Sequence, residues 1–223
     1  MPKFAANLTM LYNEVDFLDR FAAAAEGGFK GVEYLFPYAY PKEQLAERLH
    51  QHGVKQVLHN LPAGDWAAGE RGIACQPDRV GEFQDGVGKA IDYARALGCG
   101  QVNCLAGIAP AGVDREKVRG TFVANLRFAA EKLGAAGIKL LIEPVNTYDI
   151  PGFWLSRTQQ ALDVIRDQLA DNPGRNEPGT GEINYRFLFG FIDSIGYEGW
   201  IGCEYKPKGK TIDGLGWRAA HGV

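Results

Sequence analysis

The sequence is poor in cysteine and histidine, and it holds no long apolar run. Its four cysteines form no C-x-x-C pair, which argues against a disulfide-stapled fold and a cysteine-based zinc site; they are Cys75, Cys99, Cys104 and Cys203. We expect them to be small buried side chains in a reduced, cytoplasmic protein. No stretch reaches the roughly 20 apolar residues of a membrane span. The acidic residues near the start argue against a secretory signal.

An excess of basic residues is also missing. The chain of 223 residues has 24 Lys and Arg against 27 Asp and Glu, a net charge of -3 and a pI of about 5.8. This balance excludes the basic footprint of a protein that binds nucleic acid or an anionic membrane. With 46% hydrophobic residues the composition is that of an ordinary globular chain with a sizeable core. We therefore expect neither nucleic acid nor a membrane as a partner.

One unit recurs along the chain: an apolar strand, a polar loop, an amphipathic helix and a glycine turn. The predicted strands cover residues 4–8, 31–36, 55–60, 101–107, 139–146, 168–171 and 200–205. The clearest helices are predicted over 78–97 and 114–133, and a short one near 215–220. Apolar strands that alternate with helices indicate a parallel sheet covered by helices. Seven strands fit a doubly wound sheet, or a TIM (β/α)8-type barrel that lacks one βα unit.

The junction between Asp167 and Gln168 breaks the pattern. The other helices end in glycine turns before the next strand, in the segments GGFKG, HGVKQ, LGCGQ, GAAGIK and IGYEGW. In ALDVIRDQLADNP a helical pattern runs into a strand with no glycine, no proline and no loop, although such connections usually take about 2–6 residues. We infer that a strand and a helix, roughly 30–40 residues, are missing at this point.

Carboxylates follow two of the buried strands. Glu143 ends LLIEP and Glu204 ends IGCEYKP. Sites in parallel α/β folds form at the carboxyl ends of strands, and an ionised carboxylate there needs a cation or hydrogen-bond donors. Two such endings favour chemistry, and a structural salt bridge is the alternative for each. Glu33 lies inside the predicted strand 31–36, which favours a structural role.

Amides and carboxylates together suggest a metal site. Gln168 opens QLAD and offers a carbonyl oxygen to a hard cation, or it is simply a solvated end residue. Two carboxylates and an amide oxygen suit Mg²⁺ or Mn²⁺ better than Zn²⁺, which favours His and Cys. Asn7 and Asn103 lie on the first and fourth strands, where they bind substrate or satisfy the fold.

Further candidates for substrate binding are a histidine and two cations. His59 ends the strand KQVLHN, and a core histidine is the alternative. Arg71 belongs to the long loop 61–72, LPAGDWAAGERG, and long loops at strand ends often bind ligands. Lys206 follows Glu204 by two residues and shares its face of the strand. We expect Arg71 to bind an anionic substrate through a bidentate contact, and Lys206 to bind a substrate carboxylate or to stabilise the negative charge of an enediolate.

Several of these segments resemble the hydroxypyruvate isomerase family, a branch of the xylose isomerase-like TIM barrels. The resemblance extends over nearly the whole chain and includes FAANLTMLY, GVEYLFPY, LHNLPAGDWAAGERGIACQPDR, ADNPGRNEPGTGEINY and GYEGWIGCEYKP. It implies one barrel domain over residues 1–223 that interconverts hydroxypyruvate and tartronate semialdehyde. It also implies that Glu143 and Glu204 are the acid/base glutamates and, with Gln168, three of the four metal ligands.

The fourth ligand of the family is an aspartate on a strand that this sequence lacks, between Asp167 and Gln168. The sequence leaves open whether the natural protein carries that unit, or whether the chain is a shortened, inactive remnant. An isomerase of the same branch that acts on 2-oxotetronate remains a close alternative. A metal-dependent nuclease would need a histidine-rich zinc cluster and a basic face, which argues against that role. The oligomeric state, a homo-oligomer included, stays open.

Overall fold

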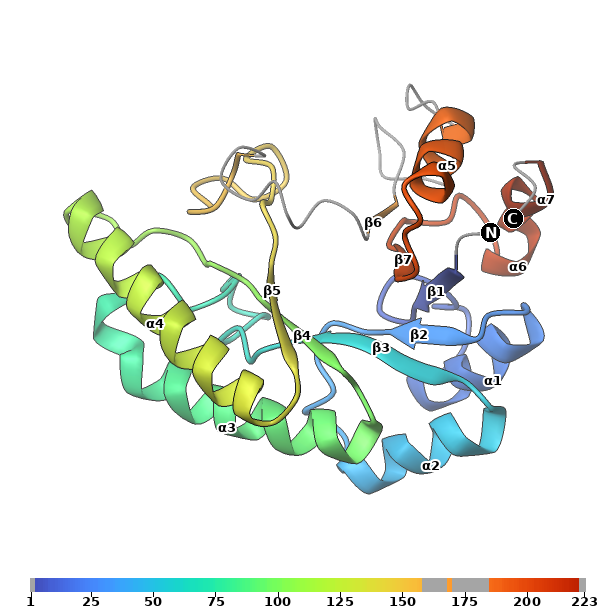
Figure 1. Ribbon diagram of the computed structural model, residues 1–223, viewed down its shortest axis with the longest axis horizontal. Coiled ribbons are helices and arrows are strands. Elements are labelled where there is room, and N and C mark those ends of the chain that lie inside the picture. Colours follow the sequence, from blue (N-terminus) through green and yellow to red (C-terminus); the bar gives the residue numbers. More distant parts are fainter. Residues whose placement is uncertain (1–2, 158–167, 170–184, 221–223) are drawn as a thin grey trace. The chain divides into compact units, whose positions relative to one another are not determined.

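The computed structural model describes residues 3–157, 168–169 and 185–220. The chain forms two units, each with its own set of internal contacts. Unit 1 comprises residues 1–35, 43–57 and 166–223, and unit 2 comprises residues 36–42 and 58–165. The single-domain prediction is not tested by this division, and each unit is described by itself. Figure 1 labels the elements of both units.

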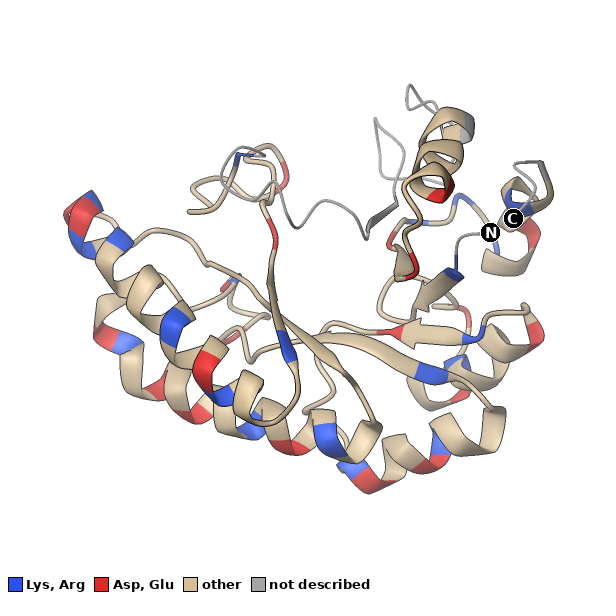
Figure 2. Cartoon of the chain, viewed as in Figure 1, with Lys and Arg blue, Asp and Glu red and all other residues tan. Residues whose placement is uncertain are grey.

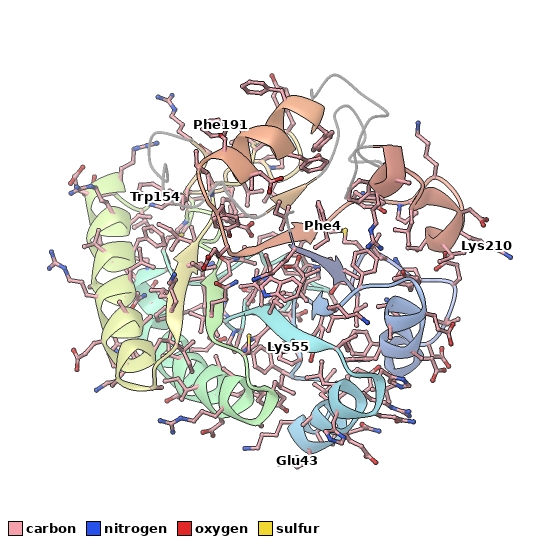
Figure 3. All side chains as sticks on the ribbon, turned by 45° about the vertical axis from the view of Figure 1, so that its right-hand side comes forward. Phe4, Glu43, Lys55, Trp154, Phe191 and Lys210 are labelled. Atoms are coloured by element: carbon pink, nitrogen blue, oxygen red, sulfur yellow. The ribbon has the colours of Figure 1, made fainter. Side chains whose placement is uncertain are left out.

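Unit 1 contains four parallel strands in the order β6–β7–β1–β2. They are β1 (Lys3–Asn7), β2 (Gly31–Glu33), β6 (Gln168–Leu169) and β7 (Trp200–Cys203). Its helices are the 3-10 turn Phe17–Asp19 with α1 (Arg20–Glu26), α2 (Lys42–His52), α5 (Tyr185–Ser194), α6 (Thr211–Gly214) and α7 (Trp217–Ala220). Two helices pack on the first strand through the ring of Phe4. The Phe4 ring centroid lies 5.3 Å from that of Trp217 in α7 and 5.5 Å from that of Phe189 in α5. Figure 3 labels Phe4 within this cluster.

Unit 2 contains parallel strands in the order β3–β4–β5, with two long helices against them. The strands are β3 (Lys55–Asn60, whose first three residues belong to unit 1), β4 (Gln101–Cys104) and β5 (Lys139–Ile142). The helices are α3 (Val80–Leu97), which follows the 3-10 turn Pro77–Arg79, and α4 (Arg115–Ala135), capped by the Asp114 side chain. The helices lie side by side, α3 against β4 and α4 against β5 (Figure 1).

The predicted alternation of strands and helices is confirmed over the described residues. The five glycine turns before the strands are confirmed as well, since each contains a glycine with positive φ: Gly28, Gly53, Gly98, Gly137 and Gly196. The all-buried strand interiors of β2 and of Ile201–Cys203 agree with a sheet covered on both faces. The predicted helical pattern up to Asp167 lies outside the described residues, as does most of the segment after Leu169.

Several predicted strands were too long. β4 ends at Cys104, β5 at Ile142 and β7 at Cys203, where we expected ends at residues 107, 146 and 205. The same holds for β2. We expected a strand over residues 31–36 with Glu33 in its interior, but β2 ends at Glu33. The chain leaves the ladder there because the backbone N–H of Leu35 donates to the Thr9 hydroxyl, at 2.9 Å, instead of to a neighbouring strand. Glu33 therefore stands at the carboxyl end of its strand, where the functional residues of parallel α/β folds gather.

The four cysteines are free and buried, as predicted from their spacing. Burial raises the pKa of the Cys75 thiol to about 11 and the pKa values of Cys104 and Cys203 further still. Basic and acidic side chains alternate along α3 and α4, with no block of one sign (Figure 2). Within the described part of the chain, no helix has the length and hydropathy needed to cross a membrane.

The end of the loop 61–72 packs closely against the segment that follows β4. The backbone at Gly72 contacts the backbone at Leu105 and Gly107. Gly72 has φ +116° and Gly107 has φ +97°. A Cβ on Gly72 would lie 2.4 Å from the carbonyl oxygen of Leu105, and one on Gly107 would lie 2.2 Å from that of Gly72. Only glycine permits both the backbone angle and this approach. This close backbone contact fixes the end of the loop next to the carboxyl end of β4.

We predict that Gly72→Ala destabilises the protein by about 3 kcal/mol, because the methyl group adds a backbone clash to the cost of a left-handed conformation. Gly69→Ala is the matched control: Gly69 lies in the same loop with φ +93°, but nothing lies within 4 Å of its added Cβ. It should cost only about 1–2 kcal/mol. Urea unfolding measures the free energy of unfolding of both variants. An equal loss in the two would show that the backbone contact at Gly72 does not constrain the loop.

Candidate active site

The first group of buried polar side chains lies at the carboxyl ends of β1 and β2 in unit 1. Asn7 and Glu33 end these strands and are paired in the parallel register. Asn7 Nδ2 donates a hydrogen bond of 3.0 Å to Glu33 Oε1, and the backbone N–H of Thr9 donates to Asn7 Oδ1 at 3.0 Å. Asn7 is 2% exposed and Glu33 is 5% exposed. The amide thus supplies a donor that a buried carboxylate needs.

Glu204 lies at the neighbouring strand end in the same unit. It follows β7 directly and is 8% exposed. Ala6 of β1 pairs with Cys203 of β7, so the next residues along these two strands are Asn7 and Glu204. The predicted site residues Asn7 and Glu204 are therefore brought together, and Glu33 joins them through Asn7.

Gln168 and Lys206 extend this edge of unit 1. Gln168 of β6 pairs with Gly202 of β7 in the parallel ladder. Glu204 lies two residues beyond Gly202 along the chain. Lys206 is exposed and lies two residues after Glu204. The backbone register thus places Gln168 beside β7, on the strand next to the one that carries Glu204, while Lys206 stands further out on the loop.

The second group centres on Asn103 in unit 2. Its Nδ2 donates two hydrogen bonds of 3.1 Å, one to Asn60 Oδ1 and one to Glu143 Oε1. Asn60 and Asn103 are paired in the register of β3 and β4, and each is only 3% exposed. Glu143 follows β5 and is half-buried. A hydrogen bond to a carboxylate favours its ionised form. Among the described residues, Asn60 Nδ2 and Asn103 Oδ1 find no hydrogen-bond partner.

His59 belongs to a different cluster, although it is the residue before Asn60. Adjacent strand residues point to opposite faces, and His59 packs against Tyr38, whose ring also meets Tyr93 of α3 at 5.2 Å. His59 Nδ1 lies 3.1 Å from the Asn60 carbonyl oxygen, which also accepts a 2.6 Å bond from the Tyr38 hydroxyl. Because a carbonyl only accepts, Nδ1 carries the proton.

The environment keeps His59 neutral. It is 1% exposed, and burial lowers its pKa from the usual 6.5 to about 4. Its Nε2 finds no hydrogen-bond partner in the described part of the chain. A histidine in this state offers a lone pair and holds no acidic proton at neutral pH, so it is suited to accept a hydrogen bond and unsuited to general acid chemistry.

Arg71 is held in place within the loop 61–72. Its Nη1 donates to the carbonyl oxygens of Trp66, at 3.0 Å, and Glu70, at 2.7 Å. The guanidinium lies 4.2 Å from the Trp66 ring centroid, and Trp66 in turn packs on Phe36 at 5.0 Å. A second arginine, Arg79, pairs with Glu70. The loop is therefore internally braced, and the Arg71 cation is oriented before any ligand arrives.

The sequence led us to His59 but not to Asn60. The two differ only in which face of β3 they occupy, and the apolar run before them does not reveal which face carries the site. The register with Asn103 is what brings Asn60 to Glu143. The signal that could have found Asn60 is the coincidence of asparagines at three strand ends, Asn7, Asn60 and Asn103.

The chain belongs to the xylose isomerase-like TIM barrel family, whose profile matches residues 21–168. The match ends at Gln168, the first residue after the junction that lacks a loop. The fold predicted from the recurring strand-and-helix unit is thereby confirmed, as is the resemblance stated from the sequence.

Among curated relatives, the chain is 50% identical to the hydroxypyruvate isomerase of Escherichia coli, over 97% of this chain and 98% of that protein. It is 44% identical to the 2-oxo-tetronate isomerase of Cupriavidus necator, over 97% of both. Among solved structures, the fold is similar to that of a Brucella melitensis protein described as an AP endonuclease of family 2. That comparison gives a TM-score of 0.94 and 42% identity over 99% of both chains.

We predict that His59 makes stability depend on pH between about 4 and 6.5. In this window the unfolded chain binds a proton at His59 and the folded chain does not, so stability rises with pH and falls as pH drops. The shift in pKa to about 4 corresponds to about 3 kcal/mol at most. In urea unfolding at several pH values, His59→Gln should flatten this part of the profile.

The exposed His50→Gln is the matched control and should leave the profile unchanged. An unaltered slope in His59→Gln would show that His59 is not held neutral.

Proposed function

We propose that the chain is an isomerase that interconverts hydroxypyruvate and tartronate semialdehyde through an enediol. The observation that carries this proposal is the 50% identity to the Escherichia coli hydroxypyruvate isomerase over nearly the full length of both chains. The curated relatives named above are isomerases of small oxo acids. The buried carboxylates at strand ends supply the acid and base that such a reaction requires.

The reaction moves a carbonyl to the neighbouring carbon, and no atom is gained or lost. In our proposal one glutamate of the pair Glu143 and Glu204 takes the proton from the hydroxyl-bearing carbon of hydroxypyruvate. The acid partner protonates the former carbonyl oxygen, which gives the enediol. Return of a proton to the adjacent carbon, with loss of the proton of the other hydroxyl, then yields the aldehyde and restores both glutamates. Asn103 supports this role because its amide donates a hydrogen bond to Glu143 Oε1 and orients the carboxylate. The low exposure of Glu204 favours proton transfer without competition from water.

The residues also fit a divalent cation in their donor chemistry. Glu143, Gln168 and Glu204 offer only carboxylate and amide oxygens, which suit Mg²⁺ or Mn²⁺. We propose these three as the residues that would hold the ion. When bound, such an ion supplies positive charge that polarises a carbonyl and stabilises an enediolate. The aspartate that the resemblance implies as a fourth ligand has no counterpart in the chain, so we expect weaker binding than in relatives that have it.

The substrate carboxylate needs a cation, and Arg71 is our first candidate. Its guanidinium is oriented by Trp66 and by two backbone carbonyls, so little freedom is lost on binding. Lys206 is the second candidate, placed two residues beyond Glu204. Asn7 and Asn103 are proposed to bind the hydroxyl and carbonyl groups. His59 packs against Tyr38 on the other face of β3, so its predicted contact with substrate stays a prediction from the sequence.

Two other activities compete with this proposal. The 44% identity to a 2-oxo-tetronate isomerase favours the same chemistry on a four-carbon substrate. The description of the Brucella melitensis structure suggests nuclease activity as the second alternative. The net charge of -3 and the mixed charges along α3 and α4 (Figure 2) do not favour binding of a nucleic-acid phosphate backbone.

We predict that Glu143→Gln and Glu204→Gln each lower kcat by roughly 10²–10⁴-fold, the usual contribution of a general acid or base. The variants keep the size of the side chain and lose only the ionisable group. Glu116→Gln, an exposed residue in the first turn of α4, is the control and should keep normal turnover. Near-normal activity in either test variant would refute its catalytic role. No turnover by the unaltered chain with saturating Mg²⁺ or Mn²⁺ would favour the inactive remnant.

We predict a higher kcat/KM for hydroxypyruvate than for 2-oxotetronate, since identity to the three-carbon enzyme is higher. A steady-state assay of both substrates with the same preparation, and of abasic-site DNA as a third, separates the alternatives. A preference for the four-carbon acid would reassign the substrate within the same chemistry, whereas DNA cleavage without isomerisation would replace it.

A further inference from the structure

Two buried amide groups in unit 2 carry polar atoms that find no hydrogen-bond partner among the described residues. They belong to Asn60 at the end of β3 and to Asn103 in β4, which are paired across neighbouring strands (Figure 1). Each residue is 3% exposed, and the atoms concerned are Asn60 Nδ2, a donor, and Asn103 Oδ1, an acceptor. Buried polar atoms are nearly always paired. This donor and this acceptor therefore need a partner that the described residues do not supply.

Two other buried asparagines are built differently. Both polar atoms of Asn7 have a partner within unit 1, because Nδ2 donates to Glu33 Oε1 and Oδ1 accepts from the backbone N–H of Thr9. Asn125 of α4 uses its Nδ2 to donate to the carbonyl oxygen of Ala74, at 2.9 Å. These amides stabilise the fold, whereas Asn60 and Asn103 retain hydrogen-bonding capacity that the fold does not use.

The carboxylate of Glu143 determines how both amides are oriented. An ionised carboxylate only accepts, so the Asn103 atom that lies 3.1 Å from Glu143 Oε1 must be Nδ2. The same Nδ2 lies 3.1 Å from the Asn60 side chain, which must present its own acceptor, Oδ1. Turning either amide over would set two acceptors or two donors against each other. Asn60 Nδ2 and Asn103 Oδ1 are therefore the atoms that remain for a ligand.

The backbone holds both amides in place. The carbonyl oxygen of Asn60 accepts a 2.6 Å bond from the Tyr38 hydroxyl. The carbonyl oxygen of Asn103 accepts a 2.8 Å bond from the backbone N–H of Leu61. Strand β4 is also paired on both sides, with β3 and with β5. Groups presented by such a frame lose little freedom when they bind a ligand.

The chemistry of these atoms selects the kind of ligand group. A carboxylate or phosphate would meet the negative charge of Glu143 and the acceptor of Asn103, and both would repel it. A hydroxyl group donates and accepts, so it matches a site that offers one donor and one acceptor. The pair of amides therefore suits the hydroxyl-bearing end of a small hydroxy acid and not its carboxylate.

We propose that Asn60 and Asn103 form a subsite for the hydroxyl group of the substrate, and that Asn60 determines the preference for hydroxylated ligands. Asn60 Nδ2 donates to the hydroxyl oxygen, and Asn103 Oδ1 serves as the acceptor for a hydroxyl proton. This inference deepens the isomerase function proposed above and rests on it for the class of ligand. It gives Asn60 a role in binding and accounts for two buried amides with unused atoms.

Calorimetric titration with glycerate and with lactate, in the presence of Mg²⁺, tests the subsite. The two acids differ only in the hydroxyl at the third carbon, and neither has the carbonyl that isomerisation requires. We expect the unaltered chain to bind glycerate about tenfold more tightly than lactate, the contribution of one hydrogen bond. Asn60→Asp keeps the size of the side chain and the acceptor that faces Asn103, but it lacks the donor and should remove this preference. Asn60→Leu should do the same without adding a charge.

Asn125→Leu is the matched control, since Asn125 is a buried asparagine of unit 2 at 1% exposure. It should lower Tm and leave the ratio of the two Kd values unchanged. The inference is overturned if the unaltered chain does not bind glycerate more tightly than lactate. It is also overturned if both Asn60 variants lower Tm but keep the preference, because Asn60 is then only structural.

The same titrations separate this inference from the proposed function. Turnover of hydroxypyruvate by a chain that shows no preference for glycerate would refute the subsite and leave the isomerase in place. A preference that depends on Asn60, in a chain without turnover, would support the subsite and refute the isomerase.

Discussion

The parallel register of neighbouring strands is the constraint on which the candidate site depends. Neighbouring parallel strands of a unit end at the same edge of the sheet. Residues far apart in sequence therefore lie side by side there, and no loop is needed to position them. Asn7 reaches Glu33 in unit 1, and Asn60 reaches Asn103 in unit 2, because each pair is one step of a parallel ladder. A slip of one residue would turn these side chains to the opposite face.

Amides are the means by which this protein buries carboxylates. An ionised carboxylate removed from water costs several kcal/mol unless donors meet it, and in each unit an asparagine of the neighbouring strand provides one: Asn7 for Glu33 and Asn103 for Glu143. An arginine or lysine in that place would neutralise the charge and remove the carboxylate from proton transfer. A neutral donor leaves the charge in place.

The sequence predicted the fold well and the site in part, for physical reasons that differ. Alternating apolar strands and amphipathic helices reveal the architecture because burial is collective, and the bounds of β3 agree with the residues expected, 55–60. The end of β2 was missed because Glu33 and the following Tyr34 are both buried, so hydropathy does not mark where hydrogen bonding passes from the ladder to the Thr9 hydroxyl. His59 and Asn60 could not be separated, since the choice of face depends on the neighbouring strand.

The strand and helix that we infer to be missing between Asp167 and Gln168 are not needed to assemble the strand-end groups of either unit. Each group of strand-end residues is assembled by contiguous strands of its own unit: Asn60, Asn103 and Glu143 by β3 to β5, and Asn7, Glu33 and Glu204 by β7, β1 and β2. The aspartate that the family resemblance implies as a fourth metal ligand would belong to that segment. The strand ends of each unit therefore form without that segment, and we expect the binding of a divalent ion to be what its absence weakens.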